Sequence, residues 1–489
     1  MGQPVYVKEG EKNILITSAL PYVNNVPHLG NLIGCVLSAD VYARFCRAMG
    51  YNTLYICGTD EYGTATETKA LEEKVTPKEL CDKFHYIHKG IYEWFDIDFD
   101  FFGRTSTPVH TQITQEIFAK LESNGYIKKD VVEQFKCGNC DIFLSDRWVV
   151  GKCPHKICGY EEARGDQCDG CGKLMNTLEL INPRCKICKN SPNVMKSHHY
   201  FLELPSVEQK LREWLEKTSQ EWTANSRSIT YAFINDGLKP RCITRDLKWG
   251  VSVPSSDPDL ANKVFYVWFD APIGYLSITE TFLGENKWEQ WWKNPDNVKL
   301  YQFMGKDNVT FHAVIFPSTL LGTNDNFTLV SDMSTTEYLN YENKKFSKTH
   351  STGVFGDSAK STNIPSEVWR FYLLANRPEQ SDTDFKWDDF MAKNNNELLA
   401  NLGNLLHRTL QFTAKYFNRQ APKFSEELLN EKDKEFFSKT LSIVLDYVNA
   451  LENVKIKEGL RIFMELSALG NAYFQETEPW VLIKNSPER

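Results

Sequence analysis

Residues 13–58 carry the pattern that most restricts the fold: a strand, a turn, a helix and a second strand in succession. Residues 13–17 and 53–58 are short apolar runs of the kind found in strands buried within a parallel sheet. Between them, apolar side chains recur at steps of three and four, and Gly50 follows as a C-terminal cap; these side chains are Leu29, Leu32, Ile33, Val36, Leu37, Val41, Tyr42 and Phe45. The sequence therefore predicts a doubly wound parallel α/β (Rossmann) domain, which binds ligands at its first strand–helix turn.

Length and composition limit the class of protein further. At 489 residues the chain is expected to contain two to four domains. Its 42% hydrophobic and 25% charged residues are typical of a soluble globular protein, and no apolar run is long enough to cross a bilayer. The N-terminus lacks the apolar core of a signal peptide, so a cytoplasmic location is expected. The net charge of −8 argues against indiscriminate nucleic-acid binding but leaves RNA recognised by shape and base contacts open.

The first turn places His28 and Gly30 where the strand gives way to the helix. A helix N-terminus offers unpaired N–H groups that suit phosphate, His28 and Asn31 can add donors, and Gly30 lets a flat base lie against the backbone. The alternative is a capped helix with a buried histidine. His28-Leu29-Gly30-Asn31 resembles the HIGH signature of class I aminoacyl-tRNA synthetases, with Asn31 departing from the last position.

A polar loop at residues 344–357 carries a second motif. It is similar to the KMSKS loop of the same class, with Phe346 for Met and Thr349 for Ser. Lys345 and Lys348 are retained, and two mobile ammonium groups can follow the negative charge that builds on departing pyrophosphate. A solvated charged loop is the alternative for this segment taken alone. The two motifs together imply an ATP site of His28, Gly30, Asn31, Lys345, Ser347 and Lys348, in which His28, Asn31, Lys345 and Lys348 are catalytic.

Three further stretches, residues 19–22, 266–275 and 303–312, resemble the methionyl-tRNA synthetase family of the archaeal and eukaryotic type, which has two zinc knuckles. Core packing is the alternative for any one stretch alone. A thioether side chain needs a soft apolar and aromatic slot. The resemblance implies that Asp60 holds the substrate ammonium, that Arg245 lies near its carboxylate, and that methionine is bound by Ala19, Leu20, Tyr22, Asp60, Trp268, Ala271, Pro272, Tyr275, Phe311 and His312. Asn308 stands where some relatives have an apolar residue.

Eight cysteines form four pairs at positions 137/140, 153/158, 168/171 and 185/188. Such pairs in a cytosolic chain indicate tetrahedral zinc rather than disulfides. Spacing alone slightly favours sequential sites, 137/140 with 153/158 and 168/171 with 185/188. The family resemblance implies nested sites instead, in which 153/158 joins 168/171 and 137/140 joins 185/188. His155 is a competing ligand, and four thiolates around each ion make the two zinc ions structural.

The rest of the chain is expected to complete the architecture. The sheet is predicted to resume at residues 264–269 and 299–304, and a helical pattern runs from 393 onward, with Leu398, Leu399, Leu402, Leu405, Leu406 and Leu410 on one face. We expect five segments: 1–125, the first half of the Rossmann domain; 126–240, a zinc-binding insertion that splits it; 241–330, its second half; 331–392, the KMSKS-loop and stem-contact region; and 393–489, an α-helical bundle that is truncated. The resemblance implies that this bundle reads the anticodon through Asn404, Arg408 and Trp480, where Trp480 ends a helical region.

The function implied by the resemblance is ligation of methionine to tRNA. ATP with Mg²⁺ would activate L-methionine as an adenylate, and tRNA(Met) would accept it, with about two structural zinc ions in the insertion. Contacts with other synthetases or accessory proteins are expected through a C-terminal extension, and no membrane is involved. Two alternatives stay open: another class I synthetase for an aliphatic amino acid, and a non-catalytic tRNA-binding relative. A nucleotide-dependent oxidoreductase is disfavoured because no G-x-G-x-x-G follows the first strand.

Overall fold

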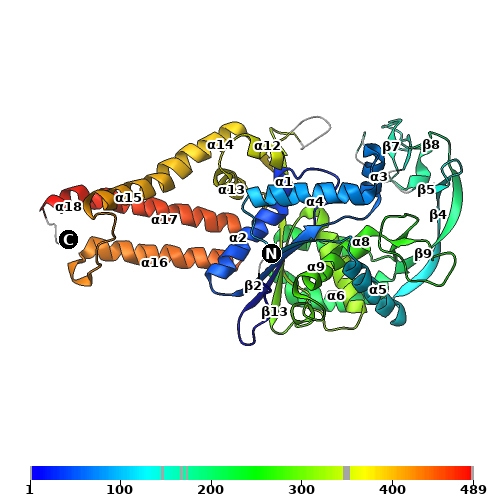
Figure 1. The fold of residues 1–489 in the computed structure, drawn as a ribbon, viewed down its shortest axis with the longest axis horizontal. Coiled ribbons are helices and arrows are strands. Elements are labelled where there is room, and N and C mark those ends of the chain that lie inside the picture. Colours follow the sequence, from blue (N-terminus) through cyan, green and yellow to red (C-terminus); the bar gives the residue numbers. More distant parts are fainter. Residues whose placement is uncertain are drawn as a thin grey trace. The chain divides into compact units, whose positions relative to one another are not determined.

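The computed structural model describes residues 3–144, 148–165, 168, 170–171, 175–344 and 353–485 (Figure 1). The chain divides into two compact units. The first comprises Met1–Pro27, Gly50–Glu93 and Asp98–Thr335, and the second comprises His28–Met49, Trp94–Ile97 and Thr336–Arg489. No helix among the described residues is long and apolar enough to cross a membrane.

The first unit is built on a five-stranded sheet of order β14-β13-β1-β2-β3. Every residue of β1 and β2 is buried, as expected for strands covered on both faces. The pairs β1–β13, β1–β2 and β2–β3 are parallel, which confirms the predicted parallel α/β sheet. The strands are β1 (Asn13–Ser18), β2 (Asn52–Thr59), β3 (Phe101–Arg104), β13 (Val298–Gly305) and β14 (Val330–Thr336).

Helices pack on this sheet and supply part of the site described below. Helix α9 (Gly274–Leu283) packs against β2 and β3, and α5 (Pro108–Ser123) packs against α9. Helix α5 begins where Thr107 accepts a hydrogen bond from the backbone of His110 and Pro108 occupies the first turn. The other helices of this unit are α3 (Thr64–Glu73), α4 (Pro77–Trp94), α6 (Leu204–Thr218), α7 (Ala224–Asn235), α8 (Val267–Asp270), α10 (Glu289–Trp292) and α11 (Phe316–Gly322), with shorter helical turns η3 (Ser219–Glu221), η4 (Ala271–Ile273), η5 (Lys306–Asn308) and η6 (Phe311–Ile315).

The prediction of a strand over residues 264–269 is wrong for most of its length. Only β12 (Val264–Phe265) is extended, and it pairs with β11 (Thr244–Arg245) outside the main sheet. Residues 267–270 instead form α8, which leads into η4 with Pro272 in its first turn. The aromatic and β-branched residues suggested a strand, but Pro272 suits the start of a helical turn. Trp268 is therefore presented from a helix.

A smaller β-rich insertion follows α5. Its strands form two sheets, of order β10-β9-β4-β5 and β7-β6-β8. The long strands β4 and β9 pair antiparallel and form the centre of the insertion, with Ile127 opposite Leu202 and Lys136 opposite Asn193. The strands are β4 (Ile127–Cys137), β5 (Ile142–Leu144), β6 (Val149–Lys152), β7 (Ala163–Arg164), β8 (Ile181–Cys185), β9 (Asn193–Leu202) and β10 (Arg241–Cys242), and η2 (Thr177–Glu179) is a short turn.

The second unit is mostly helical. The segment from Leu29 to Ala48 is helical throughout, as α1 (Leu29–Asn31), η1 (Leu32–Val36) and α2 (Leu37–Ala48), which confirms the predicted helix that Gly50 ends. Asp40 of α2 pairs with Arg44 at 2.9 Å and with Arg370 at 2.6 Å. The remaining elements are α12 (Gly356–Ser361), α13 (Ser366–Ala375), α14 (Trp387–Lys393), η7 (Asn394–Gly403), α15 (Asn404–Tyr416), η8 (Glu426–Leu428), α16 (Glu431–Glu452), α17 (Ile456–Thr477) and α18 (Pro479–Asn485), with β15 (Leu339–Tyr341) beside β16 (Thr383–Phe385).

The helical pattern predicted from residue 393 onward is confirmed, and its leucines are only partly covered. Leu398, Leu402 and Leu405 are half-buried, whereas Leu399, Leu406 and Leu410 are exposed. One expectation about the C-terminal helices is wrong, because Trp480 does not end a helical region. Helix α17 ends at Thr477, Glu478 adopts a left-handed conformation, and Pro479 starts the new helix α18 that carries Trp480.

Candidate active site

An aromatic slot lies at the end of the main sheet in the first unit. The rings of Trp268 and Phe311 stack with centroids 3.7 Å apart and an interplanar angle of 9°. Tyr22 meets Trp268 edge-on, with centroids 6.0 Å apart. The three rings come from the segment after β1, from α8 and from η6, a π-helical turn of a type often found at functional sites. The structure thus brings together three residues predicted to contact a thioether.

A buried pair of Tyr275 and His312 adds a polar but uncharged group. The Nδ1 atom of His312 donates to the carbonyl of Asn308 at 2.8 Å, so Nε2 accepts from the Tyr275 hydroxyl at 2.8 Å. Burial lowers the pKa of His312 to about 4, which keeps the ring neutral. Asn308 therefore acts through its backbone, and the pair offers a soft environment without charge.

Asp60 is the acidic group next to this slot. It follows β2 directly, its backbone N–H donates to Pro21 at 2.9 Å, and Tyr22 and Asp60 form a parallel bridge. Its side chain is buried, and among the described residues its Oδ1 atom has no hydrogen-bond partner. Burial raises its pKa well above the usual range. A buried carboxylate with an unmatched oxygen suits a cationic ligand.

The other residues predicted to bind methionine lie in the same unit. Ala19 is buried and donates its N–H to Phe303 at 2.9 Å, and Leu20 lies so close to Gly274 that a Cβ there would come within 2.9 Å of its Cδ1. Ala271 and Pro272 are buried in η4. Arg245 stacks over Tyr266, 3.6 Å from the ring centroid, and donates to the Thr244 carbonyl at 2.8 Å.

His28 and Asn31 form a reciprocal cap at the start of α1 in the second unit. The Asn31 backbone donates to Nδ1 of His28 at 3.3 Å, and the His28 backbone donates to Oδ1 of Asn31 at 3.1 Å. His28 also contacts Phe355, with ring centroids 6.3 Å apart, and burial lowers its pKa to about 4. A Cβ on Gly30 would come within 2.9 Å of the His28 ring, so the glycine permits this close cap. Lys345, Ser347 and Lys348 lie outside the described residues.

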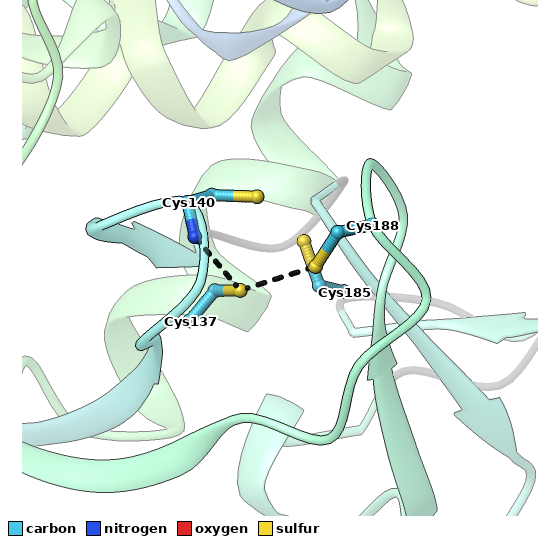
Figure 2. Close-up of side chains that lie close together, drawn as sticks. All are labelled: Cys137, Cys140, Cys185 and Cys188. Atoms are coloured by element: carbon cyan, nitrogen blue, oxygen red, sulfur yellow. Dashed lines mark hydrogen bonds between the residues drawn. The ribbon is translucent and has the colours of Figure 1, made fainter.

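The first cysteine cluster joins Cys137 and Cys140 to Cys185 and Cys188 (Figure 2). Their sulfur atoms lie within 4.8 Å of one another, and those of Cys137 and Cys188 are 3.4 Å apart. A disulfide would be about 2.05 Å long, whereas tetrahedral zinc with 2.3 Å bonds places sulfurs about 3.8 Å apart. The Asn190 backbone N–H lowers the pKa of Cys188 to about 7, which favours a thiolate ligand.

The second cluster joins Cys153 and Cys158 to Cys168 and Cys171. The Cys158 and Cys168 sulfurs are 3.6 Å apart, and those of Cys153 and Cys171 are 3.9 Å apart. His155 lies beside this cluster, with Nδ1 3.2 Å from the Cys153 sulfur. The cysteines are therefore brought together in the nested arrangement and not in the sequential one that spacing alone favoured. The donor sets of both clusters fit zinc.

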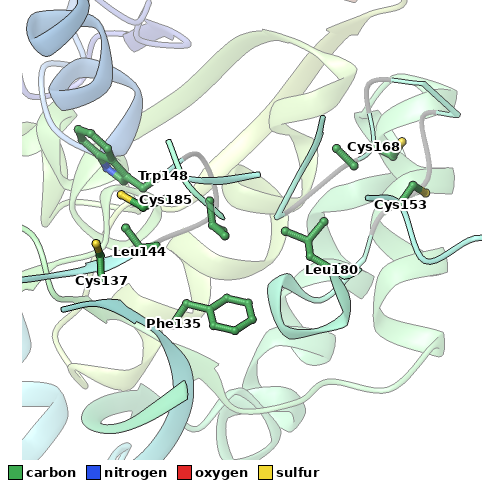
Figure 3. Close-up of a cluster of buried hydrophobic side chains, with 10 residues drawn as sticks. Phe135, Cys137, Leu144, Trp148, Cys153, Cys168, Leu180 and Cys185 are labelled. Carbon is green, nitrogen blue, oxygen red and sulfur yellow. The ribbon is translucent and has the colours of Figure 1, made fainter. Parts of the chain in front are cut away.

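The first cysteine of each pair is also part of the insertion's small core (Figure 3). In each pair the first cysteine is buried and the second is more exposed. The core that surrounds them has only a few large side chains, among them Phe135, Leu144, Trp148 and Leu180. A core this small depends on further cross-links for stability.

The three residues predicted to read the anticodon come together in the second unit. Arg408 lies 4.6 Å from the ring centroid of Phe474 and 5.8 Å from that of Trp480. Arg408 donates to Gln475 at 3.0 Å, and Asn404 donates to Asn471 at 3.0 Å. Helices α15, α17 and α18 thus present a half-buried indole, a guanidinium and an amide.

Two buried residues near Asp60 were not selected from the sequence. Asp270 lies within residues 266–275, but the sequence did not assign it a role. His110 lies in α5 and belongs to no local motif. Their side chains are 3.2 Å apart although 160 positions separate them. Only the fold could reveal this pair.

Comparison with known proteins shows what the chain is similar to. A family model described as tRNA synthetases class I (M) matches residues 14–410. The probable cytoplasmic methionine–tRNA ligase of Dictyostelium discoideum is 59% identical over 99% of this chain and 66% of its own length, and the cytoplasmic methionine–tRNA ligase of Bos taurus is 57% identical over 98% and 53%. The chain thus spans about half to two thirds of these relatives. A structure of Mycobacterium tuberculosis methionyl-tRNA synthetase with methionyl-adenylate has the same fold, with a TM-score of 0.76 at 21% identity over 96% of this chain and 85% of its own.

Proposed function

Because this chain belongs to the tRNA synthetases class I (M) family, we propose that it is an ATP-dependent methionine–tRNA ligase. The observation that carries the proposal is the slot of Trp268, Phe311 and Tyr22 beside the buried Asp60. An unbranched thioether fits such a soft aromatic slot, and the carboxylate matches the amino group. The neutral Tyr275–His312 pair offers sulfur at most a weak hydrogen bond.

The reaction proceeds in two steps. The methionine carboxylate oxygen attacks the α-phosphate of ATP, forming an acyl–phosphate bond and releasing pyrophosphate. A terminal ribose hydroxyl of tRNA(Met) then attacks the adenylate carbonyl and loses its proton, and AMP leaves with the bonding electrons. No protein nucleophile is needed, so the protein contributes positioning and electrostatic stabilisation.

The proposed roles follow from the chemistry of each side chain. His28, Gly30 and Asn31 bind ATP at the start of α1, where neutral His28 keeps a ring N–H that can donate to phosphate. Lys345 and Lys348 stabilise the departing pyrophosphate, and Ser347 binds ATP beside them. Mg²⁺ accompanies ATP and neutralises phosphate charge. Arg245 lies near the substrate carboxylate.

The remaining proposals concern organisation. Each cysteine cluster holds one structural zinc ion with no open position for substrate. Residues 1–125 and 241–330 form the catalytic domain, 126–240 the insertion, 331–392 the stem-contact region and 393–489 the anticodon-binding domain. The protein acts in the cytoplasm, where the named relatives are placed, and binds tRNA through Asn404, Arg408 and Trp480.

Amino-acid-dependent ATP–pyrophosphate exchange tests the proposal. We expect exchange with methionine and far weaker exchange with leucine, isoleucine and valine. Stronger exchange with one of those three would identify another class I synthetase. Tight tRNA binding without exchange for any amino acid would identify a non-catalytic relative.

Replacing Lys348 with alanine is expected to lower kcat for adenylate formation by roughly 100- to 1,000-fold, because one donor to a transition-state anion is lost. The KM for methionine should stay within a few-fold, since the contact strengthens mainly as pyrophosphate departs. Pyrophosphate exchange measures both constants. Lys360→Ala, an exposed lysine in α12, is the control and should leave both unchanged. Equal losses in binding and rate would contradict the role.

Replacing Trp480 with alanine is expected to weaken tRNA charging by roughly one to two orders of magnitude, because a base stacked on an aromatic ring contributes about 1–3 kcal/mol. Pyrophosphate exchange should remain near normal. Trp480→Phe keeps a ring for stacking and should retain most charging. If Trp480→Ala lowers exchange in step with charging, or sharply lowers the melting temperature, Trp480 has a structural role.

A further inference from the structure

The pair of His110 and Asp270 is fully buried within the first unit. Both side chains have 0% exposure, and Nε2 of His110 lies 3.2 Å from Oδ2 of Asp270. His110 projects from α5, Asp270 ends α8, and α9 packs against α5 with Ser277 facing the ring. Burying a charge is costly, so the protonation state of this pair, which lies next to the proposed substrate-binding carboxylate, must be explained.

The hydrogen bonds around His110 and Asp270 limit where protons can lie in this pair. The Ser277 hydroxyl has one proton and two acceptors in reach, the Gly274 carbonyl at 3.1 Å and Nδ1 of His110 at 2.9 Å. When this proton goes to Gly274, the ring carries its own proton on Nδ1 and presents a lone pair on Nε2, and an ionised Asp270 would present another lone pair to it. Two lone pairs 3.2 Å apart repel, so one proton must lie between these atoms.

The proton can reside on either partner, and burial decides which. Both side chains are fully buried, so a neutral acid beside a neutral ring avoids the cost of burying either an ion pair or a lone carboxylate whose Oδ1 atom has no hydrogen-bond partner among the described residues. Burial raises the pKa of Asp270 well above its usual range and lowers the pKa of His110 to about 3. Both effects place the proton on Asp270.

We propose that Asp270 is a neutral carboxylic acid that donates to His110, and that it is a positioning residue which leaves Asp60 as the single anion for a substrate amino group. The second half of this proposal rests on the proposed function. Asp60 and Asp270 each have a buried Oδ1 atom without a hydrogen-bond partner among the described residues. A neutral Asp270 removes the repulsion that two buried carboxylates would exert on each other.

The other ionisable groups around Asp60 do not replace this pair. Glu61 accepts from Arg104 at 2.8 Å and from Thr59 at 2.8 Å, so its charge is matched. Burial raises the pKa of the Tyr62 phenol and of the Cys81 thiol, which keeps both neutral. The ionisable groups that surround Asp60 are therefore Glu61, Tyr62, Cys81, Arg104, His110 and Asp270. Among them, Asp270 is the acid whose protonation decides the charge next to Asp60.

The variant Asp270→Asn tests the role, because a carboxamide mimics the protonated acid and its NH₂ group can donate to Nε2 of His110. We expect the KM for methionine in pyrophosphate exchange to stay within about threefold, and the low-pH limb of kcat/KM to stay at the same pH. An ionised Asp270 would instead raise the pKa of Asp60, so its removal would move the limb to lower pH. Such a shift, or a tenfold rise in KM, would overturn the proposal.

Infrared spectroscopy of the substrate-free protein tests the protonation state itself. The C=O stretch of a buried carboxylic acid should be present in the unmodified protein at neutral pH and absent from Asp270→Asn. If that variant does not fold, nitrogen-15 labelling of histidine in the unmodified protein decides. An unprotonated Nε2 is expected for His110, and either an imidazolium or a neutral ring protonated on Nε2 would overturn the proposal. These readouts need no methionine activation, so they are independent of the proposed function.

Discussion

Replacing Asp60 with asparagine is expected to lower kcat/KM for methionine activation by roughly 150- to 4,000-fold. Asp60 is buried, and among the described residues its Oδ1 atom has no hydrogen-bond partner, so a bound ammonium would be its counter-ion. Breaking a buried ion pair by removing one partner costs about 3–5 kcal/mol, and each 1.4 kcal/mol is about tenfold. Pyrophosphate exchange at varied methionine concentration measures the loss, while the KM for ATP should change little.

The neighbouring substitution Asp270→Asn is the matched control for this experiment. Both changes turn a fully or nearly fully buried aspartate into its amide, with exposures of 3% for Asp60 and 0% for Asp270. Only Asp60 is assigned to the amino group, so only Asp60→Asn should lose affinity. Nearly unchanged methionine activation in Asp60→Asn would remove Asp60 from the site.

Removing zinc is expected to unfold the insertion and to leave the main sheet folded. We expect about two zinc ions per chain after dialysis, one for each cysteine cluster. The free energy of zinc binding at such sites, on the order of 10 kcal/mol, contributes directly to folding. The insertion's own core is small, so it depends on this contribution. Metal analysis gives the count, and limited proteolysis after chelation should cut first within residues 126–240.

A pair of cysteine variants distinguishes the loss of a zinc ligand from the effect of replacing any buried cysteine. Cys185 and Cys46 are both fully buried, but only Cys185 belongs to a cluster. Cys185→Ser should lose about one zinc ion per chain, and Cys46→Ser should keep both. A metal content near zero in the unmodified protein would contradict the assignment of the clusters.

Much of the fold was predictable because local patterns agreed with the tertiary structure. The apolar runs at residues 13–17 and 299–304 became β1 and β13, and the 3.6-residue periodicity after Leu29 became a helix ended by Gly50. These segments are buried in the sheet or on one helical face, so packing reinforced what the residues favour. Residues 264–269 show the opposite case, since strand-forming side chains lie in a segment that the following proline turns into a helix.

The chemistry of the site was predictable only in part. The motifs around His28, Trp268 and Phe311 and the paired cysteines carry their signals in short stretches of sequence. The approach of His110 to Asp270 gives no such signal, because α5 and α8 are brought together by packing through α9 and the main sheet. The proton count also depends on Ser277 and Gly274, which no spacing rule would have connected to His110.

By itself, the sequence determined which residue types are available and how often they recur: a parallel α/β core, two sets of thiols for metal, and aromatic residues for an apolar ligand. These properties depend on side-chain chemistry and short-range periodicity, both of which are local. Only the tertiary structure decided that Cys137 and Cys140 join Cys185 and Cys188, that Trp268 stacks on Phe311, and that Asp60 and Asp270 are both buried. Pairing and burial depend on contacts between segments far apart in the chain, and those contacts form only when the whole sheet and its helices pack.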